Sequence, residues 1–253
     1  MNLVGTYTRF KRESKRFLSV YIQTILAPVF SNLLYLAIFG LTLNKTISNV
    51  HGISYLEFLG PGLIAMGIIN NAYQNPSSSL IISKFQGHIM DLLTIPLKAG
   101  EILFAYIASA LFRAFLIAIV TYITLSFFID FHYASIFIIF LSILMISLFF
   151  AFLGFFTGIW AKDFDNIAFI QIFILTPMIY LGGVFYSIKS LPLFFQKIST
   201  FNPIVYMIDL LRYGFTGVHD FTIWKSLIIL GIFNLIIGSI SYYTLKIGWK
   251  IKT

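Results

Sequence analysis

Long apolar segments alternate with short polar ones along almost the whole chain. A helix needs about 20 mostly apolar residues to cross the hydrocarbon core of a bilayer. Six segments reach or approach that length: residues 20–43, 56–73, 102–129, 133–160, 167–186 and 224–245. The pattern predicts an all-α membrane protein in which residues 1–253 form one domain with six transmembrane helices.

Residues 1–19 have the pattern of a basic amphipathic helix. One helical face carries Leu3, Tyr7, Phe10, Ser14, Phe17 and Tyr21, and the basic residues Arg9, Lys11, Arg12, Lys15 and Arg16 occupy the rest. Such a helix binds the surface of an anionic leaflet, so we predict an interfacial helix. The apolar run that follows is about twice as long as a signal-peptide core and ends in no small-residue cleavage site, so we expect this segment to be retained.

Residues 77–101 form the longest polar interruption between the second and third apolar segments, and we expect them in water or at its edge. On a helix over residues 80–93, one stripe carries Ile81, Ile82, Phe85, Ile89, Leu92 and Leu93, and the other side carries Ser83, Lys84, Gln86, Gly87 and Asp91. The pattern predicts a short helix that rests its apolar side on the bundle and offers its polar side to a cytoplasmic partner. A helix that only caps the bundle is the alternative.

The loop over residues 187–221 is apolar, unlike a linker that is exposed to water. Ser190 precedes Pro192 and Asn202 precedes Pro203, and a capping residue near a proline can open a helix. We therefore predict a re-entrant hairpin of two short helices, with two interfacial helices lying flat as the alternative. Gly182 and Gly183 supply a hinge or a close-packing position before it.

Composition supports the membrane class and narrows the chemistry. The chain is 59% hydrophobic and only 10% charged, with a mean hydropathy of +0.93, whereas soluble domains carry roughly 25% charged residues. The absence of cysteine excludes disulfides, thiolate metal sites and cysteine nucleophiles. The net charge of +8 gathers at membrane borders instead of forming a continuous basic surface, so we expect no nucleic-acid partner.

The distribution of Lys and Arg predicts the orientation. Under the six-helix prediction, eleven of the 17 basic residues lie on the side of the termini, five lie on the opposite side and Arg113 lies within a span. Cytoplasmic loops carry the excess of positive charge, so we expect both termini, residues 77–101 and the turn at 161–166 in the cytoplasm.

A search for catalytic motifs finds none. The chain has no G-x-x-x-x-G-K-[ST] phosphate loop, and its four histidines are scattered without metal-ligand spacing. Asp163 and Asp165 form the closest carboxylate pair, and we interpret them as a solvated turn that caps the fifth transmembrane helix. We therefore expect neither an enzyme site nor a bound metal or cofactor.

Polar residues inside the predicted spans are the remaining candidates, because they are costly in a bilayer. They are Asn70, Asn71, Gln74, Arg113 and Gln171. Arg113 could contact an anionic solute or lipid head group, or it could pair with helix-end carbonyls or with the amide side chains of this set. Asp and Glu are absent from the middle of every predicted span, which argues against a proton- or sodium-coupled carrier.

Four stretches together resemble the membrane subunit of ABC-2 type transporters, in particular the compact permeases of the bacterial inner membrane. They are residues 55–62 (YLEFLGPG), residues 84–96 with Lys84, Phe85, Gln86, Asp91 and Pro96, residues 161–165 (AKDFD), and residues 175–214 with LTP, YLGGVFY, NPIVY and RYG. The order of the predicted elements is also similar over essentially the whole chain.

The resemblance implies a bacterial inner-membrane exporter built from two copies of this chain and two separate ATPase subunits, which would bind ATP and Mg²⁺. The helix at 80–93 would correspond to a coupling helix that contacts the ATPase through Ser83, Lys84, Phe85, Gln86, Ile89, Asp91 and Leu92. The N-terminal helix would be a second ATPase contact. The substrate route would run along the dimer interface between the first, second and fifth spans, with an outer gate at Gly182, Gly183, Asn202 and Pro203.

Two function classes follow. The first is an export permease for a lipid, glycan or drug-like solute. The alternative is an ion-coupled secondary transporter or a non-transporting membrane anchor. An adjacent gene for a phosphate-loop ATPase would favour the first class.

Overall fold

A computed structural model describes residues 2–40, 42, 49–50, 52–89 and 96–249. Its helical elements are, in chain order, α1 (Leu3–Leu18), η1 (Ile22–Leu26), α2 (Ala27–Tyr35), η2 (Leu36–Gly40), α4 (Tyr55–Phe85), α6 (Ala99–Leu125), α7 (Ile136–Trp160), α8 (Phe164–Phe169), η3 (Ile170–Leu175), α9 (Thr176–Tyr180), η4 (Ile188–Ser190), α10 (Leu193–Thr200), α11 (Pro203–Thr216) and α12 (Ile223–Ile247). Two short antiparallel strands, β1 (Asn49–Val50) and β2 (Ile53–Ser54), precede α4. Prediction and structure therefore agree on a mostly helical protein.

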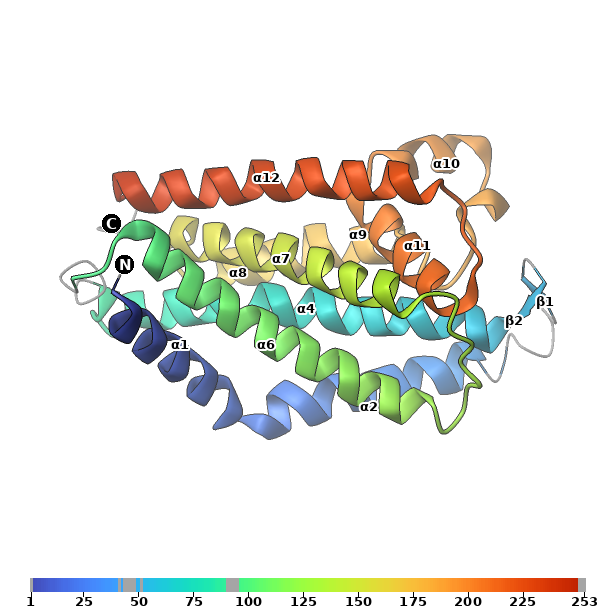
Figure 1. The fold of residues 1–253 in the computed structure, drawn as a ribbon, viewed down its shortest axis with the longest axis horizontal. Coiled ribbons are helices and arrows are strands. Elements are labelled where there is room, and N and C mark those ends of the chain that lie inside the picture. The colour runs from blue at the N-terminus through green and yellow to red at the C-terminus, as the bar shows by residue number, and fades with distance from the viewer. Residues whose placement is uncertain (1, 41, 43–48, 51, 90–95, 250–253) are drawn as a thin grey trace.

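The long helices run along one axis of the molecule, and α4 lies in the middle of the bundle (Figure 1). Both chain ends lie at one end of the bundle, whereas α10, α11 and the two strands lie at the other. Most of α4 is buried, and it packs most extensively against α7. A Cβ on Gly158 of α7 would lie 2.9 Å from the Leu80 Cβ, so the small residues Gly154 and Gly158 permit this close approach.

Within the described residues, four helical segments are long and apolar enough to cross a membrane: Ile22–Gly40, Ala99–Leu125, Ile136–Trp160 and Ile223–Ile247. They correspond to the predicted first, third, fourth and sixth spans. The predicted second span lies inside α4, which is long but more polar, and the fifth corresponds to the shorter apolar helix Phe164–Tyr180. For these two segments, crossing of the membrane stays a prediction.

The predicted start of a separate helix at residue 80 is wrong. The helix α4 continues without interruption from Tyr55 to Phe85, and Gln86, Gly87 and His88 form a turn in which Gly87 has a φ of 74°. The segment predicted to lie in water, residues 77–101, begins in the buried part of α4, where the Ser77 Oγ donates to Tyr73 O at 2.8 Å. The remainder of the predicted helix, residues 90–93, lies outside the described residues.

The predicted hairpin is present as two helices with different environments. Asn202 caps α11 by accepting from the Ile204 amide at 3.0 Å, and Pro203 is its first residue, as the sequence indicated. Ser190 caps nothing in α10, which begins after Pro192. Nearly all of α11 is buried in the bundle, whereas α10 exposes Leu193 and Phe194, and Phe201 directly after it is exposed as well. A re-entrant path through the outer leaflet stays a prediction.

Candidate functional site

A polar groove of about 420 Å³ lies between the helical segment Ile22–Gly40, called the first helical segment below, the helix α4 and the η3–α9 segment. Its walls carry amide and hydroxyl side chains among apolar ones. The lining residues are Gln23, Ala27, Pro28, Ser31, Asn32, Tyr35, Met66, Gly67, Asn70, Asn71, Gln74, Gln171, Thr176 and Tyr180. The structure thus brings together four of the five polar residues that the sequence singled out within the spans.

Two prolines shape opposite walls of this groove. Pro28 is the second residue of α2, which follows the π-helical turn η1, and Pro177 is the second residue of α9, which follows the π-helical turn η3. A proline ring clashes with the carbonyl four residues earlier, and the wider π turn relieves that clash. The hydroxyl of Thr176, the first residue of α9, donates to Gln171 O in η3, five residues back, at 2.9 Å. A proline and a π-helical turn thus occur together in both walls.

A tyrosine pair joins the two outer walls of the groove. The hydroxyls of Tyr35 and Tyr180 lie 3.0 Å apart, and Tyr35 also packs against Phe185 with ring centroids 5.7 Å apart. The Tyr186 hydroxyl donates to Tyr180 O at 2.9 Å. The Tyr35–Tyr180 pair lies at the end of α9, just before Gly182 and Gly183. It therefore bounds the groove at the end near α10 and α11.

Arg113 does not line the groove, but it contacts Asn71, which does. Its Nε and Nη2 donate to the Asn71 Oδ1 at 3.0 and 2.8 Å, and the Asn71 amide donates to Gly67 O at 3.0 Å. The guanidinium also lies 5.8 Å from the ring centroid of Phe17 in α1. This geometry favours the pairing role over an anion site, because Arg113 fixes one wall of the groove to α6 and α1.

The residues of the predicted outer gate meet at one corner of the bundle. Gly183 adopts a φ of 81°, and a Cβ on Gly182 would lie 2.8 Å from Ile204 of α11. The Asn202 amide donates to Met178 O of α9 at 2.7 Å, which joins the end of α9 to the start of α11. Their proximity is observed, and their role as a gate stays a proposal.

Arg212 holds this corner together, although the sequence indicated only an external loop residue. Its side chain is buried, its Nε donates to Phe58 O at 3.2 Å and its Nη2 donates to Gly183 O at 2.7 Å. The guanidinium stacks 3.7 Å from the centroid of the Phe58 ring. One turn earlier on α11, Asp209 accepts from the backbone amides of Asp220 and Phe221 at 2.7 and 3.0 Å.

The N-terminal helix α1 packs into the bundle through charged residues. Glu13 is buried and lies 3.3 Å from the Arg9 Nη2, 3.2 Å from the Arg16 Nε and 2.6 Å from the Ser79 hydroxyl. Arg9 also donates to the Tyr106 hydroxyl, and Arg16 donates to Asn75 O at 2.7 Å. Arg9 and Arg16 therefore point into the bundle, whereas Lys11, Arg12 and Lys15 are exposed. Binding of α1 to the leaflet stays a prediction.

Two exposed aromatic side chains lie near the end of the bundle that carries the termini. Phe85, at the end of α4, is 60% exposed and packs on Phe164 of α8, with ring centroids 4.9 Å apart. Asp163 caps α8 by accepting from the Asn166 amide at 2.8 Å, as the sequence predicted.

The other residues predicted at the ATPase contact have varied surroundings. Gln86 is exposed, and the Ser83 hydroxyl donates back to Ser79 O at 2.9 Å. Lys84 donates to Ile159 O and, at 2.8 Å, to Ala161 O at the end of α7. Ile89 is buried in a core cluster with Leu80 and Ile102. Asp91 and Leu92 lie outside the described residues.

Sequence reasoning missed Glu13, Tyr35, Tyr180 and the inward position of Arg212. A signal existed for Glu13, since it is the single acid in a basic helix and has an arginine four residues before it and another three residues after it. Tyr35 and Tyr180 are 145 positions apart in the chain, so no local pattern pairs them.

These features define a multi-pass helical membrane protein with a polar groove among apolar helices. The chain belongs to the ABC-2 type transporter family, which matches residues 5–216. It is 40% identical over 209 residues to the inner membrane transport permease YadH of Escherichia coli (strain K12), covering 83% of this chain and 82% of that protein. It is 28% identical over 192 residues to Nodulation protein J of Rhizobium leguminosarum bv. viciae, covering 76% and 74%.

The family assignment fixes the general role of the protein. Members of this family are the membrane subunits of ABC transporters, and they work with ABC ATPase partners that carry the nucleotide chemistry. Together with the apolar helices, the similarity to an inner membrane permease indicates a multi-pass protein of the inner membrane.

Proposed function

We propose that two copies of this chain form an export route for a neutral or amphipathic solute such as a lipid, a glycan or a drug-like molecule. The polar groove carries this proposal. None of its lining residues is charged, and they offer amides and hydroxyls beside apolar surface. This mixture suits a substrate with hydrogen-bonding groups and an apolar body better than it suits an ion.

Exposed apolar residues on both sides of the groove support a second copy. On the first helical segment, Ile22, Leu26, Phe30, Leu34 and Ile38 recur every four residues and are 48–65% exposed, and Phe169, Ile172 and Phe173 are exposed on the other rim. Amide side chains are costly to leave against hydrocarbon. A homodimer that packs these rims together would shield the two grooves from lipid and join them into one route.

A buried amide supports occupancy of the groove by a polar molecule. Within the described part of the chain, the Nδ2 of Asn32 is buried and has no hydrogen-bond partner, and Asn32 lines the groove. Buried polar groups are nearly always satisfied, so a substrate group or a water in the groove would be its partner.

Energy would come from outside the chain. The sequence contains no phosphate loop, and two of the described buried acids, Glu13 and Asp209, are already engaged by arginines or by backbone amides. Glu101, the third described buried acid, accepts from the backbone amides of Asn2 and Lys98. This arrangement favours an ATP-driven subunit over an ion-coupled carrier. We place ATP and Mg²⁺ on two partner ATPases, and we place both termini and the Phe85–Phe164 pair on the cytoplasmic side, following the excess of basic residues there.

Removing an amide from the groove should weaken transport. We expect Gln74→Leu and Gln171→Leu each to lower the export rate about tenfold, because each loses a hydrogen bond worth ~1–2 kcal/mol to the substrate. The measurement is ATP-driven export of a panel of lipids, glycans and amphipathic drugs from vesicles that contain both subunits. Ile172→Leu, on the exposed rim, is the matched control and should export normally. Normal export by both groove variants would exclude this substrate route.

A further inference from the structure

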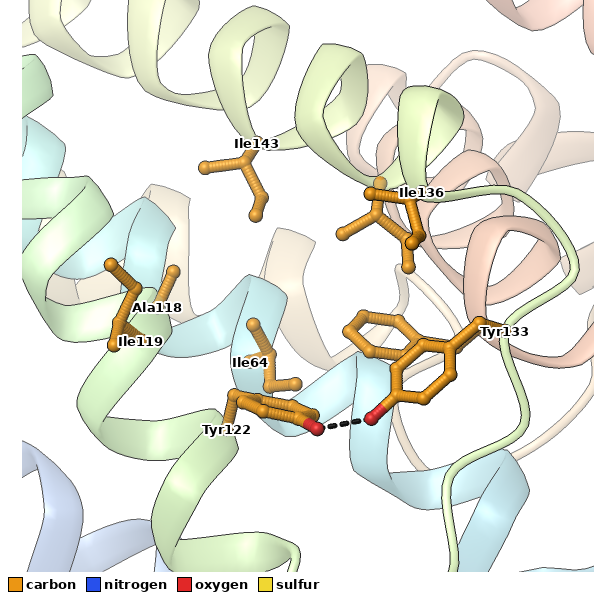
Figure 2. A pocket seen from close by; sticks show the side chains of 9 residues that line it. Ile64, Ala118, Ile119, Tyr122, Tyr133, Ile136 and Ile143 are labelled. Carbon is orange, nitrogen blue, oxygen red and sulfur yellow. Dashed lines mark hydrogen bonds between the residues drawn. The ribbon is translucent and has the colours of Figure 1, made fainter.

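A second cavity, of about 350 Å³, lies on another side of the bundle, between α6 and α7. It is almost entirely apolar. Its lining residues are Ile64, Ala118, Ile119, Tyr122, Tyr133, Ile136, Ile139, Ile143 and Phe215. Figure 2 shows the labelled side chains of α6 and α7 on either side of an open space, with Ile64 of α4 between them.

The cavity exists because its two walls are held by different neighbours. On one side, α7 is tied to α11, since the Ser135 amide donates to Gly214 O at 3.0 Å and a Cβ on Gly214 would lie 2.6 Å from Ile139. On the other side, α6 crosses the bundle obliquely and packs mainly on α4 and α1 (Figure 1). The two helices therefore separate towards the end of the bundle that lies away from the termini.

The polar atoms of the cavity gather at its rim. The hydroxyls of Tyr122 and Tyr133 hydrogen-bond to each other, as the dashed line in Figure 2 marks. Tyr122 lies close to the end of α6 and Tyr133 lies just before α7. The pair therefore lies where the chain passes from one candidate membrane-spanning helix to the next. Tyrosines at this depth typically mark the membrane–water interface.

The apolar part of the cavity extends from this rim towards the middle of the bilayer. Ile136 and Ile143 on α7 are about 10 Å apart along the helix axis, at 1.5 Å per residue. Three of the lining residues, Ile119, Tyr133 and Ile136, are 55%, 53% and 73% exposed. An apolar space of this kind does not hold ordered water, and if empty it forfeits dispersion contacts along its walls. It opens sideways towards lipid.

We propose that this cavity binds one acyl chain of a bilayer phospholipid, with the ester or head group of that lipid at the Tyr122–Tyr133 pair. A phospholipid has the same order of groups as the cavity: hydrogen-bonding atoms at the interface and a hydrocarbon chain below them. The bound chain fills the gap between α6 and α7 and supports their separation. This site is distinct from the polar groove, with which it shares no lining residue.

Photo-cross-linking of the full chain in vesicles tests the site. The probe is a phosphatidylglycerol with a diazirine in its acyl chain, present as a minor component, and adducts are mapped by peptide mass spectrometry. We expect adducts on Ile64, Ile119 and Ile143 well above those on Ile236, which is 52% exposed on α12. Adducts spread evenly over cavity and bilayer-facing residues would overturn the proposal.

Two further arms separate a resident lipid from other occupants. Ile143→Trp fills the cavity and should reduce adducts on Ile64 to the level on Ile236, whereas Ile123→Trp, on the exposed side of α6, should leave them unchanged. If Ile143→Trp fails to fold, the proposal is still tested by the distribution of adducts between the cavity residues and Ile236 on the unmodified chain. Adducts that persist in a folded Ile143→Trp, or that vanish only while ATP-driven transport runs, would overturn the proposal, since the latter would mark a transported substrate.

Discussion

Replacing Glu13 by glutamine should destabilise the protein by about 3 kcal/mol and release α1 from the bundle. The carboxylate is the partner of both Arg9 and Arg16, and Arg9 is itself buried. Removing one member of a buried ion pair leaves an uncompensated charge, which typically costs 3–5 kcal/mol. The measurements are the free energy of unfolding in detergent and the protease sensitivity of residues 3–18.

The matched control for Glu13→Gln is Lys11→Gln, which also removes a charge from α1 but from an exposed position. Its unfolding free energy should stay within about 0.5 kcal/mol of the unmodified chain. Equal stability of the two variants would mean that α1 is held by its apolar residues alone.

Replacing Arg212 by methionine should cost about 3 kcal/mol or more and loosen the corner between α4, α9 and α11. Methionine keeps much of the apolar volume but leaves Phe58 O and Gly183 O without their charged donor, and each such bond is worth about 1.5–3 kcal/mol. Arg212→Lys should recover only part of the loss, because one ammonium cannot stack on Phe58 and reach both carbonyls as a planar guanidinium does.

Unfolding of these variants in detergent, followed by tryptophan fluorescence, checks the Arg212 prediction. Lys189→Met removes a basic residue from the same region, where the Lys189 side chain is 60% exposed and paired with Asp220 at 3.3 Å. Exposed ion pairs contribute at most about 1 kcal/mol, so this control should stay close to the unmodified chain. A loss in Arg212→Met no larger than in Lys189→Met would refute the role assigned to Arg212.

The parts of the fold that could be predicted from sequence are those with a local physical signal. Asn202 before Pro203 predicted the start of α11, and Asp163 predicted the cap of α8, because a cap and its amide lie within three residues of each other. The apolar runs predicted the four long apolar helices in the same way, since length and hydropathy are properties of one segment.

The errors arose where polar groups find partners within the fold. Ser77, Ser78 and Ser79 suggested an exposed segment, but Ser77 and Ser78 bond to carbonyls four residues earlier and Ser79 bonds to Glu13, so α4 stays helical and buried through them. Likewise, a helical wheel places Arg9 on a polar face but does not show that Tyr106, 97 positions away, receives its hydrogen bond.

The candidate site was predicted in part for the same reason. Asn70, Asn71, Gln74 and Gln171 stood out because amides are conspicuous in an apolar span, and the structure places all four at one groove. The position of Arg113 behind Asn71 depends on the packing of α6 against α4, which the sequence does not specify. The tyrosine pair that closes the groove depends on contact between the first helical segment and α9.

We propose that a separate ATPase moves this subunit and docks where Phe85 packs on Phe164. The most direct measurement compares Phe85→Glu with Phe201→Glu, a substitution of an 85% exposed phenylalanine beyond α10 at the other end of the bundle. Each variant is purified together with the ATPase and assayed for ATP-driven transport. We predict that Phe85→Glu keeps its second copy but loses the ATPase and transport, whereas Phe201→Glu keeps all three. Normal ATPase retention and transport by Phe85→Glu would contradict the account.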